Sequence, residues 1–162
     1  MKPKIANKIP LLGSIMYFFL GGSSYYFLEI AFRGYSHYSM FIAGGLSLMA
    51  INILCCTSNK FKDKNVILKA IIGGFLITII EFIVGIVFNV FLNKEIWDYT
   101  EMPLNLLGQI CLPFSIVWII LSFPAIFVCT FCNGRFLPWL LMLSESRMKR
   151  KDICYKNDKK SE

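Results

Sequence analysis

The sequence predicts an all-α integral membrane protein built as a bundle of four helices. Of its 162 residues 56% are hydrophobic, and four long apolar segments contain only two charged residues, Glu29 and Glu81. The segments are residues 10–32, 38–56, 70–92 and 110–131. Each is close to the roughly 20 residues that a helix needs to cross a bilayer. This segregation of charge excludes a soluble enzyme, a disordered chain and a nucleic-acid-binding protein with a folded basic face.

The first segment, residues 10–32, has the basic start and apolar body of a signal peptide. It is longer than the apolar region of a signal peptide, and it lacks an A-x-A-like cleavage site. We therefore expect an uncleaved membrane helix. The turn Arg33–His37 would connect it to the second segment.

The later segments are joined by polar connections of different lengths. Thr57–Asn65 precedes the third segment, and Asn93–Gln109, which is acidic and aromatic before Pro103, precedes the fourth. Pro113 and Pro124 lie in the fourth segment. Each is expected to kink that helix, because proline lacks the N–H of an α-helical hydrogen bond.

The end of the chain changes from apolar to basic. Residues 136–143 are apolar but too short to span, so we expect them to lie along the inner interface and to complete a transmembrane domain of residues 1–143. Residues 144–162 form a basic tail, expected to be cytoplasmic and disordered. The tail either attracts anionic lipid headgroups or only fixes the orientation.

The distribution of basic residues predicts the orientation in the membrane. Four spans place 15 of the 17 Lys and Arg residues on one face and leave Arg33 and Lys94 on the other. Basic residues are retained on the cytoplasmic side, so both termini should be cytoplasmic. The aromatic anchors expected at the outer headgroups are Tyr35, Tyr38, Trp97 and Tyr99.

A short internal similarity raises the question of a tandem helix-hairpin repeat. Gly21-Gly22 precedes Glu29, and Gly73-Gly74 precedes Glu81, at the same offset of 52 residues. Two hairpins related by an axis along the membrane normal would explain this offset. Chance is the alternative, because glycine pairs are common where membrane helices pack closely.

Glu81 is the main candidate for a functional residue. It lies roughly 18 Å along the third helix, near mid-membrane, where a carboxylate is costly and marks a polar contact or site. Gly85 and Asn89 follow on the same face, and Asn52 could lie on the same axis. One interpretation is a cation or proton site that also includes Glu29. The other is an interhelical contact in which protonated Glu81 bonds to Asn52 or to a backbone carbonyl.

The remaining polar residues do not predict catalysis. An i,i+4 ion pair with Arg33 is a sufficient explanation for Glu29. His37 is the only histidine, so neither a zinc triad nor a Ser-His-Asp site can be assembled, and no GxxxxGK[ST] loop exists for ATP phosphates. Cys129-Thr-Phe-Cys132 is more simply explained by packing. We expect no catalytic residue, metal site or cofactor.

A second candidate site lies in the outer loops. Its residues are Arg33, Gly34, Trp97, Asp98, Tyr99, Pro103, Asn105 and Gly108. Proline, asparagine and glycine favour a tight turn before the fourth helix. Asp98 could accept hydrogen bonds within the loop or pair with Arg33. A well-capped loop and a ligand site are both consistent with this motif.

Several strings together resemble a known family. They are Phe32-Arg33-Gly34-Tyr35-Ser36-His37, Glu81-Phe-Ile-Val-Gly85 with Asn89, Trp97-Asp98-Tyr99-Thr100, Met102-Pro103-Leu104-Asn105-Leu106-Leu107-Gly108-Gln109-Ile110-Cys111, and Trp118. From about Phe18 to Ser122 the chain resembles the bacterial "putative ABC-transporter type IV" family, often described as ABC transporter permeases. The resemblance implies a small multi-pass protein of the bacterial plasma (inner) membrane that works with a separate ABC ATPase.

The expected function is therefore that of a permease-like component without enzymatic activity of its own, whose substrate the sequence does not identify. Four helices are too few for a complete pathway, so we expect a homo-oligomer or a complex with other membrane subunits in the lipid bilayer. The alternative is a non-transporting structural or regulatory membrane protein that binds a partner. No nucleic-acid partner is expected.

Overall fold

The structure is a computed structural model that describes residues 8–139, 142 and 143. These residues form four α-helices and one antiparallel pair of two-residue strands, which confirms the all-α prediction. Four helical stretches are long and apolar enough to cross a membrane. The predicted disordered tail, residues 144–162, lies outside the described residues, as does part of the predicted interfacial segment 136–143.

The chain divides into two units between Cys129 and Thr130. The first unit contains α1 (Lys8–Arg33), α2 (Tyr38–Ile51), α3 (Val66–Gly85) and nearly all of α4 (Leu112–Phe131). In the second unit, a π-helical segment, η3 (Cys132–Phe136), leads into helical residues as far as Trp139. The site described below lies entirely within the first unit.

Two of the predicted segments continue beyond their α-helical part as π-helices. These are η1 (Asn52–Thr57) after α2 and η2 (Ile86–Phe91) after α3. A π-helical turn contains an extra residue and is frequent at functional sites. Asn89 lies in η2, so its spacing from Glu81 and Gly85 departs from that of a regular α-helix. All three residues are nevertheless buried.

Local sequence signals set the helix ends. His37 caps the N-terminus of α2, and its Nδ1 accepts a hydrogen bond from the amide of Ser39 at 3.2 Å. Asn65 caps α3 in the same way, because its Oδ1 accepts from the amide of Ile67 at 2.6 Å. Gly34 follows α1 with a φ of 78°, a conformation that suits glycine. Gly34 and His37 together explain why the chain turns between α1 and α2.

Glycine pairs bring successive helices into close contact. Gly21-Gly22 of α1 faces α2, where a side chain at the first position would collide with the carbonyl of Gly44. Gly73-Gly74 of α3 faces α4 at Ser122 and Ile119. Small residues allow such close approach of membrane helices. Each glycine pair thus packs against the next helix in the chain, whereas the tandem repeat itself stays a prediction.

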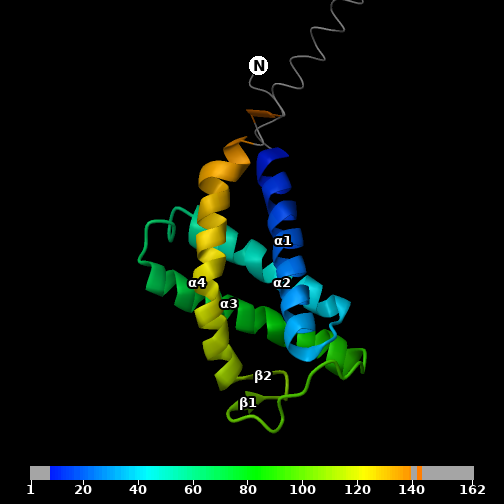
Figure 1. Ribbon diagram of the computed structural model, residues 1–162. Helices are drawn as coiled ribbons and strands as arrows, with labels where there is room; N and C mark the ends of the chain where they lie inside the picture. The colour runs from blue at the N-terminus through cyan, green and yellow to red at the C-terminus, as the bar shows by residue number, and fades with distance from the viewer. Residues whose placement is uncertain (1–7, 140–141, 144–162) are drawn as a thin grey trace, which may run out of the picture. The chain divides into compact units, whose positions relative to one another are not determined.

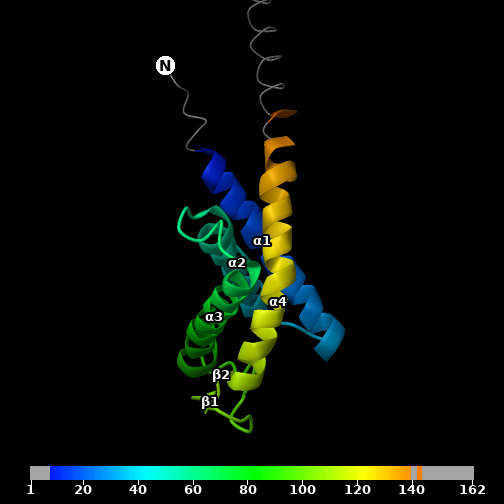
Figure 2. The same cartoon turned by 90° about the vertical axis from the view of Figure 1, so that its left-hand side faces the viewer.

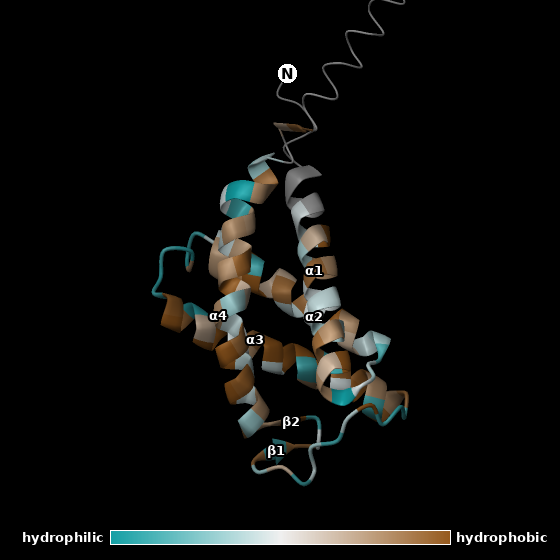
Figure 3. Cartoon of the chain, viewed as in Figure 1, coloured by the Kyte–Doolittle hydropathy of each residue, from teal (hydrophilic) through white to brown (hydrophobic). Residues whose placement is uncertain are grey.

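Different segments of the first unit lie at its two ends (Figures 1 and 2). The start of α1 and the last turns of α4 lie at one end, and the short strands β1 (Asn105–Leu106) and β2 (Ile110–Cys111) lie at the other (Figures 1 and 2). Figure 3 shows helices covered mainly by hydrophobic residues and a hydrophilic loop between α2 and α3. Lipid requires such an apolar outer surface, with backbone polar groups bonded inside each helix.

The two prolines of the fourth helix have different consequences. Pro113 is the second residue of α4, where its missing N–H would have no helical partner, so the expectation of a kink there was wrong. Pro124 lies inside the helix. Its ring removes the usual hydrogen bond to the carbonyl four residues earlier.

Candidate functional site

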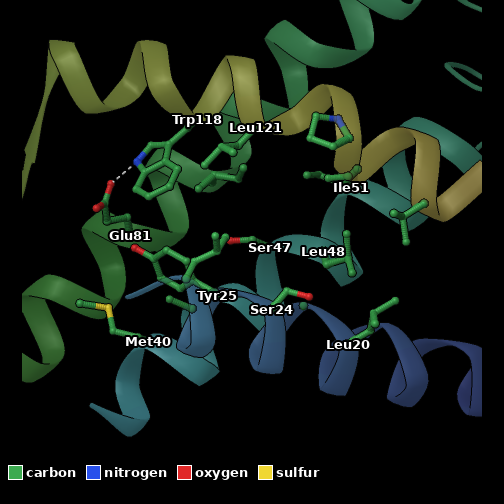
Figure 4. A pocket seen from close by; sticks show the side chains of 18 of the residues that line it. Leu20, Ser24, Tyr25, Met40, Ser47, Leu48, Ile51, Glu81, Trp118 and Leu121 are labelled. Atoms are coloured by element: carbon green, nitrogen blue, oxygen red, sulfur yellow. Dashed lines mark hydrogen bonds between the residues drawn. The ribbon is translucent and has the colours of Figure 1, made fainter. Parts of the chain in front are cut away.

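Glu81 is the centre of a buried polar network. Only 6% of this residue is exposed, and both of its carboxylate oxygens accept hydrogen bonds. Trp118 of α4 donates its indole N–H to Oε2 at 2.6 Å (Figure 4), and Tyr99 donates its hydroxyl to Oε1 at 3.2 Å. A buried carboxylate is costly unless it has such partners. The two bonds therefore stabilise Glu81 and connect α3 to α4 and to the loop after η2.

Asn89 holds that loop against η2. Its Nδ2 donates to the carbonyl of Trp97 at 3.0 Å and to Oε1 of Gln109 at 2.8 Å. Its Oδ1 accepts from the amide of Ile96 at 2.8 Å. Asn89 and Gln109 are both buried. Because one side chain satisfies three groups of an irregular segment, the loop can pack into the helical unit without orphaned polar atoms.

Trp97 is part of the interior. Its indole N–H donates to the carbonyl of Gln109 at 3.0 Å, and its ring packs with Met40, Ala43 and Val84. Only 7% of the residue is exposed. The expectation that Trp97 anchors the protein at the headgroups was therefore wrong. The indole N–H finds its polar partner inside the protein instead of at the membrane surface.

Gly85 provides the space into which the loop packs. A Cβ atom at this position would lie 2.6 Å from Oε1 of Gln109 and 3.1 Å from Cζ2 of Trp97. Both distances are shorter than ordinary van der Waals contacts between non-bonded atoms. The glycine thus permits the close approach of Gln109 and Trp97 to α3.

Tyr99 lies half-buried between the loop and α4. Its ring stacks on Phe114 with centroids 4.8 Å apart, and its amide donates to the carbonyl of Gly108 at 2.8 Å. Burial raises the pKa of the Tyr99 phenol well above its usual range, and the negative charge of Glu81 raises it further. The phenol consequently stays a neutral hydrogen-bond donor. This hydroxyl points toward Glu81 and donates to its carboxylate.

The outer part of the loop is a hydrogen-bonded turn. Asp98 accepts from the amide of Thr100 at 2.9 Å and from its hydroxyl at 3.0 Å. Asn105 donates to the carbonyls of Thr100 and Met102 at 3.0 and 2.9 Å. Gly108 has a φ of 65° and lies between β1 and β2. The carboxylate of Asp98 therefore stabilises the turn by its two hydrogen bonds to Thr100.

Arg33 connects the two outer loops. Its Nη1 lies 2.9 Å from Oε1 of Glu29, which confirms the predicted i,i+4 ion pair. Its Nη2 donates to the hydroxyl of Tyr35 at 3.0 Å and to the carbonyl of Ile96 at 3.1 Å. The link between the loops thus runs through a backbone carbonyl, not through Asp98.

The two sets of candidate residues form one connected structure. The network that joins them consists of Glu81, Gly85, Asn89, Trp97, Tyr99, Gln109 and Trp118. Asn52 is buried at the start of η1 and is not among the described residues that line the cavity beside Glu81. Gly34 and Pro103 are exposed turn residues.

Sequence reasoning did not select Gln109 and Trp118 as site residues. Both occur in the strings that resemble the family, and both are polar-edged side chains among apolar neighbours. A side chain with a polar group in an apolar stretch was the sequence signal that could have identified both residues. Helical periodicity could not show which residue on another helix each of them would meet.

A cavity of about 290 Å³ lies beside Glu81 within the first unit. All four helices contribute to its lining. One end carries Glu81, Trp118 and Tyr25, and the opposite end carries Leu20 and Leu48 (Figure 4). Among the described lining residues, Glu81 is the only acidic one, and none is Lys, Arg or His. The cavity therefore combines an apolar body with one carboxylate end.

Four apolar helices that are long enough to cross a membrane, with a buried carboxylate among them, fit an integral membrane protein. Residues 16–149 match the family described as "Putative ABC-transporter type IV", and the chain belongs to this family. This match confirms the resemblance inferred from the loop strings and extends it toward the C-terminus. No curated protein and no solved structure is significantly similar to the chain.

Proposed function

We propose that this chain is the permease-like, membrane-spanning component of an ABC-type transport system in the bacterial plasma membrane. A separate subunit would supply ATP hydrolysis, and the chain would have no enzymatic activity of its own. Family membership and the four apolar helices support a membrane protein of this class. The sequence has no GxxxxGK[ST] loop, so energy from ATP would have to come from a partner.

The observation that carries this proposal is the position of Glu81 on the wall of a cavity. A carboxylate that only joins two helices needs no empty space beside it. Ionisable residues within spanning segments commonly mark substrate or ion pathways. A cavity of about 290 Å³ next to Glu81 is the feature expected of a pathway or binding site.

A non-transporting structural or regulatory protein is the second candidate. The two hydrogen bonds from Trp118 and Tyr99 to Glu81 favour it, because they account for the carboxylate within the chain. Glu81→Gln separates the two functions. Glutamine can keep both bonds but not the charge, so transport through Glu81 predicts a loss of flux at an unchanged level of membrane protein, whereas a purely structural role predicts no change. Glu81→Leu loses both bonds, and a purely structural role predicts a lower protein level for that variant.

The proposed ATPase partner can be tested directly. The tagged full-length chain, cross-linked in native membranes and purified in mild detergent, should bring with it a polypeptide that azido-ATP labels and that hydrolyses ATP. Mutation of that polypeptide's nucleotide site should abolish the hydrolysis. An unrelated tagged four-span protein is the control. Absence of a nucleotide-binding partner at native expression levels would contradict the proposal.

The number of helices leads to a proposal about assembly. Four helices from one chain enclose a small cavity, so we propose that a complete pathway forms in a homo-oligomer or with other membrane subunits. The mass of the detergent-solubilised complex, measured by native mass spectrometry, should exceed that of one chain. A single chain in complexes that retain ATPase activity would be inconsistent with this assembly.

A further inference from the structure

We propose that the cavity beside Glu81 binds an apolar organic cation, an amine or quaternary ammonium group on a hydrocarbon body, that enters between α1 and α4. The proposal rests on the proposed function in so far as it names the substrate class of the same site. Its physical basis is the division of the cavity into a carboxylate end and an aliphatic end.

The shape and composition of the cavity suit a small amphipathic molecule. Its volume of about 290 Å³ is at the lower limit of typical ligand pockets, which begin near 300 Å³. Leu20, Leu48 and Ile51 provide an aliphatic wall away from Glu81 (Figure 4). A hydrocarbon body placed there would gain free energy from the burial of apolar surface.

The opposite end offers the groups that recognise a cation. The ring of Trp118 lies edge-on to that of Tyr25, with centroids 5.6 Å apart, and both rings line the cavity next to Glu81. Aromatic rings attract ammonium groups, and the attraction grows when the cation is desolvated. No basic side chain among the described lining residues compensates the charge of an ionised Glu81. A bound cation would supply that compensation.

The carboxylate retains capacity to bind a ligand. Each oxygen of an ionised carboxylate can accept about two hydrogen bonds. In the described part of the chain Oε2 accepts one from Trp118 and Oε1 accepts one from Tyr99. These two bonds orient Glu81 and leave lone pairs that can accept hydrogen bonds from a protonated amine. A quaternary ammonium group would instead be attracted by the negative charge of the carboxylate.

The open side of the cavity indicates how a ligand would enter. The lining residues Leu28 of α1 and Leu121 and Val128 of α4 are exposed, whereas Ser47 and Ile51 of α2 are buried. The exposure of these lining residues places the opening between α1 and α4. At this depth a spanning helix faces hydrocarbon, which excludes strongly hydrated ions and admits lipophilic cations.

The test measures binding by the purified full-length chain in nanodiscs. The probe is radiolabelled benzyltrimethylammonium, and its uncharged carbon isostere neopentylbenzene is the matched comparison. We expect saturable binding of the cation, at least about tenfold tighter than binding of the isostere, a difference of about 1.4 kcal/mol. Glu81→Gln should lower cation affinity about tenfold and leave the affinity for the isostere unchanged.

Two further variants make the result specific. Glu29→Gln removes a carboxylate that is paired with Arg33 and does not line the cavity, so cation binding should be unchanged. Ala125→Phe fills the cavity without altering Glu81 and should abolish binding of both probes. A glutamine at position 81 can still accept from Trp118 and donate to the hydroxyl of Tyr99, so this variant should fold.

Three results would overturn the proposal. Equal affinity for the two probes would mean an apolar cavity suited to a lipid chain or a partner helix. Unchanged cation affinity in Glu81→Gln would place the cation elsewhere, and the absence of binding by either probe would remove the site. None of these measurements needs the ATPase, so the ligand class can fail while the transport proposal stands, and the reverse is also true.

Discussion

The indole N–H of Trp118 lies 2.6 Å from Oε2 of Glu81 and joins α4 to α3 inside the apolar part of the protein. This is a charge-assisted bond if Glu81 is ionised, and such bonds are short and strong. The indole of tryptophan can only donate, so Oε2 of Glu81 must be the acceptor in this bond. Glu81 and Trp118 thus set the relative positions of two helices that are separated by an irregular loop.

Trp118→Phe should destabilise the protein by about 1–3 kcal/mol. The substitution keeps an aromatic ring in the site but removes the donor, and a buried acceptor that loses its partner costs about that much. The midpoint of thermal unfolding in detergent, followed by size-exclusion chromatography of heated samples, measures the loss.

The control and the coupling experiment make this prediction specific. Trp139→Phe replaces an exposed tryptophan and should change stability by less than about 0.5 kcal/mol. The double variant of Trp118→Phe and Glu81→Gln should lose less than the sum of its single variants, because the two side chains share one bond. Strict additivity would show that the bond contributes nothing to stability.

The sequence determined the helices more fully than it determined the site. Segment length and charge placed all four spans, because lipid tolerates few charges in any spanning stretch. The sequence also predicted an inward face of Glu81, Gly85 and Asn89, and all three are buried although Asn89 lies in the π-helical η2. The inward packing of Trp97 did not, since it depends on the meeting of Asn89 and Gln109 across an irregular loop.

The conformation of that loop explains the difference. Several of its residues other than glycine have positive φ angles, which intrinsic preferences do not predict. They are Asn93, Glu95, Leu104 and Leu107. Tertiary hydrogen bonds to Asn89 and Gln109 support this backbone, and a pattern of hydrophobic residues carries no information about such bonds.

Gly85→Ala should destabilise the protein by about 1–3 kcal/mol. The added methyl group would lie 2.6 Å from Oε1 of Gln109, whose position is fixed by its bond to Asn89, so the loop or the side chain must shift. Thermal unfolding and protease cleavage within the loop Asn93–Gln109 measure the two consequences. Gly134→Ala is the matched control, because a methyl group there meets no atom within 4 Å. Equal effects of the two variants would contradict the described packing.

The glycines at the helix contacts should differ in their tolerance of a methyl group. Gly21→Ala should reach the upper end of the usual overpacking cost of about 1–3 kcal/mol, because the methyl group meets the backbone carbonyl of Gly44. Gly73→Ala should cost less, because its nearest neighbour is the side-chain hydroxyl of Ser122 at 2.8 Å. Ser122→Ala in the Gly73→Ala background should recover part of the loss and should not help Gly21→Ala. The reverse order of the two glycine variants in thermal unfolding would be inconsistent with these contacts.

Cysteine accessibility should reveal four spans with both termini in the cytoplasm. The experiment starts from a variant in which the six native cysteines are replaced by serine or alanine. Glu101→Cys lies in the exposed loop before α4 and should react with a membrane-impermeant maleimide in intact cells. Lys62→Cys in the loop between α2 and α3 and Arg150→Cys near the C-terminus should react only after permeabilisation, because basic residues are retained inside. Labelling of position 62 or 150 from outside would contradict the predicted orientation.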